Sequence, residues 1–297
     1  MTKSRKIAYL ALTINAFIWG AALPIVKPVY EFLTPMQYLY FRFLVAGVVS
    51  FPIFLYFYIK RHPKISYMIK LLLMEVFGTA LPLYILYEGL AKTSALTASL
   101  IGATGPIFVV LGGIWFLHER ETKREWQGLV FSLIGSLVLV IAPTIQTGVY
   151  SPTFTLGNLY ILGYNILYAV YAILAKKFYK QNPPLYFGSL VYLITALIYY
   201  LILRFTHSLP SYALLTTSQV LLPVLYMAIP GGLLAFTLYL IASSRIEVSE
   251  ANLFTYLNGV IAIPTAYLLL GETPSFISLI AIIIIAFGVY RAEKKSA

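Results

Sequence analysis

Residues 277–290 read ISLIAIIIIAFGVY, an apolar segment near the C-terminus that holds no charged side chain. A helix needs about 20 mostly apolar residues to cross the hydrocarbon layer of a bilayer, and this segment with its neighbours approaches that length. Similar windows recur through the whole sequence. We therefore expect an all-α integral membrane protein with ten transmembrane helices, at residues 7–27, 35–58, 71–91, 95–117, 126–145, 156–175, 184–203, 219–241, 251–270 and 275–290.

The composition agrees with a membrane protein. Of the 297 residues, 60% are apolar and 10% are charged, whereas a soluble domain carries about 25% charged residues. The net charge of +11 does not indicate a nucleic-acid partner, because the charges lie in short stretches between apolar runs and form no basic polar surface. The absence of Cys excludes disulfides, zinc–thiolate sites, iron–sulfur clusters and a thiol nucleophile.

The positive charges predict the orientation, since Lys and Arg are retained on the cytoplasmic side of a membrane. With a cytoplasmic N-terminus, all but four of the 21 Lys and Arg residues fall on the cytoplasmic side. Lys27, Lys92 and Arg204 fall on the other side, and Arg42 lies within a span. The basic start resembles a signal peptide, but its apolar run is long and lacks a clear cleavage site. We expect a multi-pass protein of the cytoplasmic membrane with both termini in the cytoplasm.

The sequence contains an internal repeat. A shift of 153 residues aligns the third to fifth windows with the eighth to tenth, and a shift of 149 aligns the first two with the sixth and seventh. The aligned pairs include Gly78 with Gly231, Glu119 with Glu272, Gly135 with Gly288, Trp19 with Tyr168 and Lys27 with Lys176. The repeat predicts two five-helix units, residues 1–146 and 147–297. Five crossings are an odd number, so the second unit is inverted relative to the first, an arrangement typical of secondary transporters.

Several short motifs follow one another in a fixed order. They are Phe41-Arg42-Phe43-Leu44 with Ala46, Gly89-Leu90-Ala91-Lys92-Thr93-Ser94-Ala95, Ala98-Ser99-Leu100-Ile101, Pro106-Ile107, Glu119, and Gly128 with Gly135. Through these motifs the chain resembles the EamA family of the drug/metabolite transporter superfamily. The second half carries a degenerate version, with Gly259 where the first half has Pro106. The resemblance implies a ten-helix transporter that moves small organic metabolites, often amino acids or related compounds, without ATP hydrolysis.

Two positions predict interrupted helices near the middle of the membrane. Gly105-Pro106 lies in the fourth window, and Asn258-Gly259 is its repeat partner in the ninth. Proline removes a backbone donor and kinks a helix, and transporter sites are commonly built where helices break. Pro24 and Pro82 offer additional breaks. The alternative is that these residues only allow close packing of helices. We expect a substrate site between the two repeats, formed mostly by the first, third, fourth, sixth, eighth and ninth helices.

Amide and aromatic side chains at the same depth are further candidates for substrate binding. They are Asn15, Trp19, Tyr84, Asn165, Tyr168, Tyr256 and Asn258. An asparagine that faces lipid leaves its amide without a partner, so we expect the asparagines to face the interior of the bundle. Aromatic residues are less diagnostic, because many of the 25 Tyr residues belong to interfacial belts or to the core.

Four ionisable residues within or at the margins of the spans, Lys27, Arg42, Glu75 and Glu88, are functional candidates, because charges are costly in a bilayer. Arg42 and Glu88 lie at nearly the same depth. We expect Arg42 to form an ion pair with Glu88 or, as a less favoured alternative, to attract a substrate carboxylate. Glu75 lies near the cytoplasmic boundary, where it either pairs with Lys70 or carries a proton. Glu75 and Glu88 are therefore candidates for coupling to H⁺.

The sequence lacks the motifs of the competing classes of function. No GxxxxGK[ST] segment is present, the three His residues are scattered, and Asp is absent. We therefore predict no catalytic residues, no metal site and no cofactor, and hence no enzyme. The remaining function is alternating-access transport of a small-molecule substrate, in a chain expected to be monomeric rather than homodimeric. The alternatives are an uncoupled facilitator or channel on the same scaffold, a membrane-embedded lipid-acting protein, and a receptor or assembly subunit.

Overall fold

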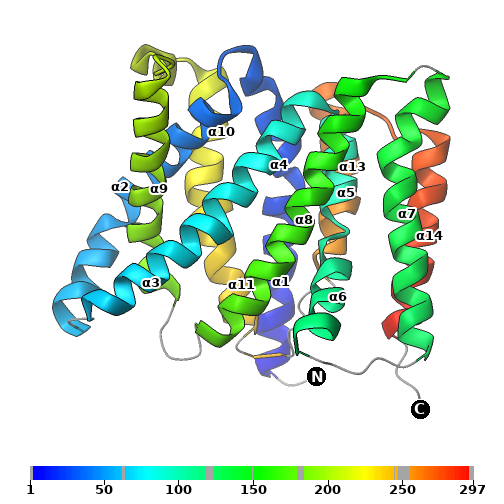
Figure 1. Cartoon of the computed structure of the whole chain (residues 1–297), viewed down its shortest axis with the longest axis horizontal. Coiled ribbons are helices and arrows are strands. Elements are labelled where there is room, and N and C mark those ends of the chain that lie inside the picture. The colour runs from blue at the N-terminus through cyan, green and yellow to red at the C-terminus, as the bar shows by residue number, and fades with distance from the viewer. Residues whose placement is uncertain are drawn as a thin grey trace.

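The computed structural model describes residues 3–61, 64–117, 123–148, 150–178, 184–243, 245–246 and 254–293, and every regular element within them is a helix. The elements are α1 (Lys3–Val26), η1 (Lys27–Glu31), α2 (Pro35–Arg61), α3 (Ile65–Glu75), η2 (Val76–Ala80), α4 (Leu81–Lys92), α5 (Ala95–Gly102), α6 (Gly105–Leu117), α7 (Lys123–Thr147), α8 (Pro152–Phe178), α9 (Pro184–Phe205), η4 (Tyr212–Thr216), α10 (Ser218–Ala228), η5 (Ile229–Leu234), α11 (Ala235–Ser243), α13 (Tyr256–Leu270) and α14 (Phe276–Glu293). The predicted all-helical class is confirmed. Figure 1 shows a bundle in which α3, α4 and α8 are inclined, and α1 begins at the end of the bundle where α14 ends.

The predicted windows coincide with the helices. All ten windows fall on helical segments, several of which are interrupted. Within the described residues, six segments are long and apolar enough to cross a membrane, and three shorter apolar helices accompany them. The protein is therefore a multi-pass membrane protein by length and composition, while the count of ten spans stays a prediction.

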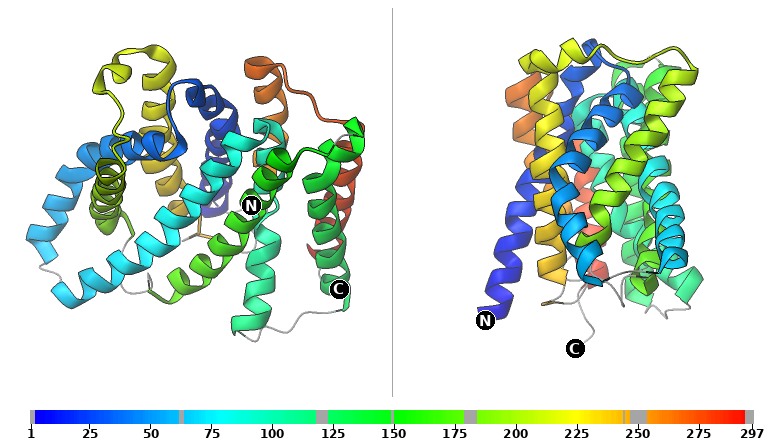
Figure 2. Two further views of the ribbon diagram at one scale, coloured as in Figure 1. Left: turned by 45° about the horizontal axis from the view of Figure 1, so that its top comes forward. Right: turned by 90° about the vertical axis from the view of Figure 1, so that its left-hand side faces the viewer.

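The helices pack in pairs that are distant in sequence. α7 packs along α14, α2 along α9, α4 along α8, and α1 along both α11 and α13. Figure 2 shows the α2–α9 pair at one edge of the bundle and the α7–α14 pair at the other. Glycines allow the close approach. A Cβ atom added at Gly135 of α7 would lie 2.6 Å from Ile285 Cγ1 of α14, and one added at Gly89 of α4 would lie 2.7 Å from the Gly157 carbonyl oxygen of α8.

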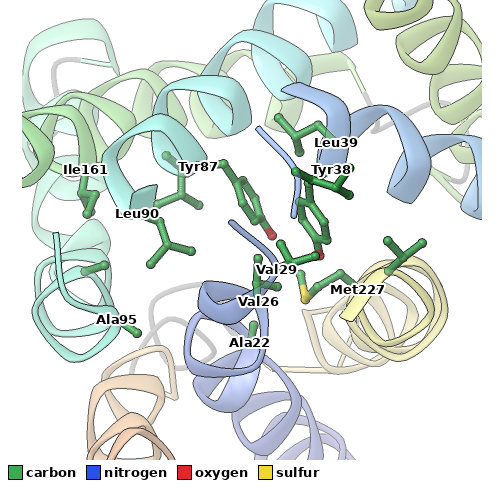
Figure 3. Packing of buried hydrophobic residues seen from close by; sticks show 14 of the residues in the cluster. Ala22, Val26, Val29, Tyr38, Leu39, Tyr87, Leu90, Ala95, Ile161 and Met227 are labelled. Carbon is green, nitrogen blue, oxygen red and sulfur yellow. The ribbon is translucent and has the colours of Figure 1, made fainter. Parts of the chain in front are cut away.

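Large tyrosine rings fill the core between α1, α2, α4 and α10. Tyr38 and Tyr87 are fully buried, and their ring centroids lie 5.4 Å apart. Figure 3 shows these two rings directed toward each other, with Val26, Val29 and Met227 beside them. The Tyr38 hydroxyl donates to the Pro223 carbonyl at 3.2 Å. The polar end of this ring therefore has a hydrogen-bond partner within an otherwise apolar core.

Three helical rods are interrupted within the bundle. The π-helix η2 separates α3 from α4, the π-helix η5 separates α10 from α11, and a turn at residues 103–104 separates α5 from α6. The predicted break at Gly105-Pro106 is confirmed, because α6 begins at Gly105 with Pro106 in its first turn, where a missing N–H costs no intrahelical bond. Pro82 lies at the start of α4, directly after η2, so the interruption of the helix lies on the N-terminal side of this proline.

The other two predicted breaks have different outcomes. Pro24 lies inside α1, which continues to Val26, so no break occurs there. The prediction at Pro24 was wrong because a single proline removes one backbone donor, which a membrane helix tolerates without ending. In the ninth window, α13 begins at Tyr256 after a turn at residues 254–255, so Asn258-Gly259 lies in the first turn of a helix, as Gly105-Pro106 does. Residues 247–253, which precede this turn, lie outside the described residues.

The sharp turn between α4 and α5 is held by two charged side chains. Lys27 Nζ donates to the carbonyl oxygens of Leu90 at 2.6 Å and of Thr93 at 2.7 Å, at the C-terminal end of α4. The Glu272 carboxylate accepts from the backbone N–H groups of Ala95 at 3.1 Å and Leu96 at 2.7 Å, at the N-terminus of α5. Each charge has the sign that the adjacent helix end favours.

We predict that Gly135→Ala destabilises the protein by about 1–3 kcal/mol, because the added methyl group forces α7 and α14 apart. The measurement is thermal unfolding of the purified protein in detergent. Gly163→Ala is the matched control, since a Cβ at Gly163 of α8 meets nothing within 4 Å. An equal effect of the two substitutions would contradict the tight α7–α14 contact.

We predict that Glu272→Ala lowers the free energy of unfolding by about 1–3 kcal/mol, because two backbone N–H groups lose a charged acceptor. The exposed Glu31→Ala is the control and is expected to change little. Thermal unfolding of the two variants side by side tests the difference. An unchanged unfolding temperature for Glu272→Ala would mean that water replaces the carboxylate at no cost.

Candidate functional site

A cavity of about 300 Å³ lies in the middle of the bundle. The residues described along its wall come from α1, α2, η2, α4, α5, α6, α8, α9, α10, η5, α11 and α13, together with Ala103 and Thr255. All six helices that were expected to form the site contribute residues to this wall. The second and seventh windows contribute as well, through α2 and α9, whereas none of these wall residues comes from α7 or α14. Figure 1 shows α7 and α14 set apart at one side of the bundle.

The structure brings most of the sequence-predicted site residues together at this cavity. Seven of them line it: Trp19, Arg42, Gly105, Pro106, Asn165, Tyr168 and Asn258. They come from α1, α2, α6, α8 and α13, and so from both predicted repeats. Whether they contact a substrate stays a prediction, but their convergence on one cavity gives them a common location.

The other predicted residues lie elsewhere. Asn15 is buried, and its Nδ2 donates to the Ala235 carbonyl at 2.6 Å. Tyr84 and Tyr256 are partly buried and pack against the hydrophobic core. Glu88 forms an ion pair with Lys92, one helical turn away, at 2.6 Å. Glu75 is the last residue of α3, and its side chain lies outside the described part of the structure.

The expected ion pair between Arg42 and Glu88 is wrong. Arg42 Nη1 donates to the Tyr87 hydroxyl at 2.9 Å, and the guanidinium carbon lies 5.4 Å and 5.6 Å from the ring centroids of Phe43 and Tyr87. Tyr87 and Glu88 are consecutive on α4, and consecutive helical residues point about 100° apart. Because Tyr87 faces Arg42, Glu88 turns toward Lys92 instead.

Aromatic side chains contribute nine of the 30 residues described along the cavity wall, and the sequence analysis missed seven of them. They are Phe43, Tyr87, Tyr164, Tyr171, Tyr192, Phe236 and Tyr239. On α8, Tyr164, Tyr168 and Tyr171 follow one another at helical spacing, and neighbouring ring centroids lie 5.9 Å and 6.2 Å apart. That spacing was the available signal, since residues three or four apart share one face of a helix.

Side chains of α1 donate hydrogen bonds to carbonyl groups in and just beyond the π-helix η5. Trp19 Nε1 donates to the Gly231 carbonyl at 2.9 Å, and Asn15 Nδ2 donates to the Ala235 carbonyl just beyond η5. Trp19 therefore uses its N–H within the protein, and its side chain also lines the cavity.

Side chains of α8 and α9 serve the interrupted helices of the first half in the same way. Asn165 Nδ2 donates to the Ile101 carbonyl at 2.8 Å and to Thr104 Oγ1 at 3.2 Å, across the break between α5 and α6. The Tyr199 hydroxyl donates to the Ala80 carbonyl at the end of η2 at 2.8 Å. Asn165 thus lines the cavity and also stabilises the break.

The site has the chemistry of a binding cavity. Among the described residues, Arg42 is the one formally charged residue on the wall, and no group of three or more His, Cys, Asp or Glu could hold a metal ion. Hydroxyl, amide and guanidinium groups are set among aromatic rings, a composition typical of pockets that bind small molecules.

Comparison with known proteins gives the family. The model of the EamA-like transporter family matches residues 6–141 and, a second time, residues 155–292. A solved crystal structure, 18% identical in sequence, matches with a TM-score of 0.67 over 96% of both chains, which shows a shared fold.

Two curated relatives span most of the chain. An uncharacterized transporter of Archaeoglobus fulgidus is 23% identical over 97% of this chain and 97% of its own length. An S-adenosylmethionine uptake transporter of Rickettsia bellii is 26% identical over 86% of this chain and 84% of its own length. With the family model matching both halves, the resemblance seen in the sequence is confirmed: the chain belongs to the EamA-like transporter family and is a multi-pass membrane transporter.

Proposed function

We propose that this protein is a secondary transporter that carries a small organic metabolite, such as an amino acid or a related compound, across the cytoplasmic membrane by alternating access. The observation that carries the proposal is the central cavity, whose wall is built from interrupted helices of both halves. Its volume of about 300 Å³ lies at the lower end of the range for small-molecule pockets. Interrupted helices around a central site are typical of secondary transporters.

The proposed architecture is two inverted repeats, residues 1–146 and 147–297, with five spans in each. One family model matches both parts of the chain. The π-helices η2 and η5 begin at Val76 and Ile229, and these positions differ by the offset that aligns Gly78 with Gly231 in the sequence. The same backbone irregularity at repeat-related positions supports a common ancestry of the two halves.

The packing of the helices supports a pseudo-two-fold axis between the halves. If each predicted span of the first half is exchanged with the corresponding span of the second half, the contact between α1 and α11 becomes the contact between α8 and α4. The contact between α1 and α13 becomes the contact between α8 and α6 in the same way. The α2–α9 and α7–α14 pairs exchange into themselves. Such an axis allows the two halves to trade conformations, which is the basis of alternating access.

Coupling to H⁺ and the orientation of the chain in the membrane are further parts of the proposal. Glu88 already binds Lys92, so Glu75 is the better candidate for carrying H⁺, and both termini are placed in the cytoplasm. The named substrate of the Rickettsia bellii relative is an amino-acid derivative, which supports the amino-acid-related class of substrate for this chain. A monomer suffices, because the cavity is complete within one chain.

Counterflow in proteoliposomes tests the function. Vesicles that contain the purified protein are loaded with pooled unlabelled metabolites, and accumulation of each labelled compound is measured. We expect saturable accumulation that a competitor suppresses. Flux without saturation or exchange would indicate a channel, and no accumulation by folded protein would contradict transport of such metabolites.

We predict that Gly102→Leu abolishes counterflow and leaves the fold intact. A Cβ atom at Gly102 meets nothing within 4 Å, and Gly102 lines the cavity, so the new side chain occupies substrate space. Gly163→Leu is the control, because its position is equally open but is not part of the cavity wall. Transport by Gly102→Leu at the wild-type rate would show that the substrate passes elsewhere.

A further inference from the structure

We propose that the cavity selects an organic anion. Its anionic group binds Arg42, an N–H or O–H group elsewhere on the same molecule donates to the Asn258 side-chain oxygen, and a planar apolar body lies between the two. This inference rests on the proposed transport function and narrows its substrate class from amino acids and related compounds, which include zwitterions and cations, to organic anions with a hydrogen-bond donor.

The charge of the cavity wall is the first argument. Arg42 is 9% exposed and is the one formally charged residue among the described wall residues. No Glu residue lines the cavity in the described part of the chain, and the sequence holds no Asp. A lone cation in a membrane interior is costly, and such groups are found paired or on a substrate pathway. A net negative ligand offsets the charge, whereas a cation is repelled.

The hydrogen-bonding capacity of Arg42 is the second argument. A guanidinium carries five N–H donors in a planar fork that matches the two oxygens of a carboxylate. Within the described structure, one hydrogen bond of this guanidinium is made, to the Tyr87 hydroxyl. The neighbouring Phe43 and Tyr87 rings provide a weaker contact through their faces. Donors therefore remain for an anionic group that enters the cavity.

The Asn258 side-chain oxygen is the third argument. It is buried, and no donor in the described structure bonds to it. A buried acceptor without a partner is destabilising. Asn258 lines the cavity, so we infer that rotation of its amide brings this oxygen to a donor that arrives with the ligand. Arg42 belongs to α2, at the α9 side of the bundle, and Asn258 belongs to α13, which packs on α1 and α5 (Figure 1). The two groups thus recognise different parts of one molecule.

The aromatic wall defines the body of the ligand. Trp19 and Tyr239 lie with ring centroids 6.1 Å apart, and Tyr168 lines the same cavity from α8. Flat apolar groups stack well on such rings. An ammonium group would also meet ring faces, but it would find no carboxylate among the described wall residues, so a zwitterion gains less than an anion.

A series of ligands on one ring system tests the anionic group and the hydrogen-bond donor separately. Indole-3-acetate carries the anion and the ring N–H, indole-3-acetamide removes the charge, 1-methylindole-3-acetate removes the N–H, tryptamine is a cation and tryptophan is a zwitterion. The readout is ligand-induced stabilisation of the purified full-length protein, which follows from binding to the folded state. We expect indole-3-acetate to bind about tenfold or more tightly than the amide and the cation. No stabilisation by it, or equal stabilisation by tryptamine or tryptophan, would overturn the inference.

Substitutions test which of the two residues, Arg42 or Asn258, causes each ligand preference. Arg42→Gln is expected to abolish the preference for indole-3-acetate over indole-3-acetamide, and Arg42→Lys to retain part of it. Asn258→Leu is expected to abolish the preference for the N–H over the N-methyl compound. It is also expected to raise the unfolding temperature of the ligand-free protein, because a buried acceptor without a partner is removed. This second readout keeps the proposal testable if the Arg42 variants do not fold. An unchanged ligand preference in Asn258→Leu would remove Asn258 from the site.

Counterflow of the same series separates this inference from the proposed function. Transport of zwitterionic amino acids without transport of the anion would overturn the inference and leave the transporter intact. Binding of the anion without transport of any compound would overturn the proposed function and leave the anion site standing.

Discussion

Interrupted helices in a membrane must have their freed backbone groups satisfied within the protein, and the rest of this structure follows from that constraint. Lipid cannot supply the missing partners at a π-helix or a break. Here side chains of other helices supply them, and in most cases they belong to the other half of the chain. Trp19 serves η5, Asn165 serves the α5–α6 break and Tyr199 serves η2. The Glu272 carboxylate likewise binds the N-terminus of α5, a helix of the other half of the chain.

This constraint joins the two halves at the places where each is weakest. A hydrogen bond from one half of the chain to an interrupted helix of the other half links the position of the first half to the bend of that helix. The cavity lies where these breaks meet, so a movement of one half changes the cavity wall and the bend together. The α7–α14 pair contributes no described residue to the wall, and its close glycine contact is suited to a rigid packing unit. The interrupted helices thus gather around the cavity, and the uninterrupted α7 and α14 lie together at one side of the bundle (Figure 1).

The sequence was sufficient for the helical segments, the Gly105-Pro106 break and seven of the cavity residues, because hydropathy and proline act locally. It was insufficient where the answer depends on the rotation of one helix against another. Arg42 and Glu88 were paired by depth, and depth says nothing about which face of α4 turns inward, so Tyr87 was missed as the partner. Asn15 is buried, as expected of an asparagine that faces the interior, but it is not among the described wall residues, and its amide donates to the Ala235 carbonyl. The α8 tyrosines were hidden among 25 similar residues.

The few polar groups that lack partners are informative because the remainder of the interior is so well satisfied. Three buried side-chain atoms of the described residues accept or donate no hydrogen bond: the hydroxyls of Tyr30 and Thr195 and the side-chain oxygen of Asn258. Of these three residues, Asn258 alone lines the cavity. Arg42, the charged residue of the wall, likewise has fewer bonds than its donors allow. Both groups weaken the empty protein, and both gain when a complementary molecule enters. A site that is under-satisfied while empty binds through the interactions it lacks, which is the physical reason for assigning recognition to these two side chains rather than to Asn165 or Trp19.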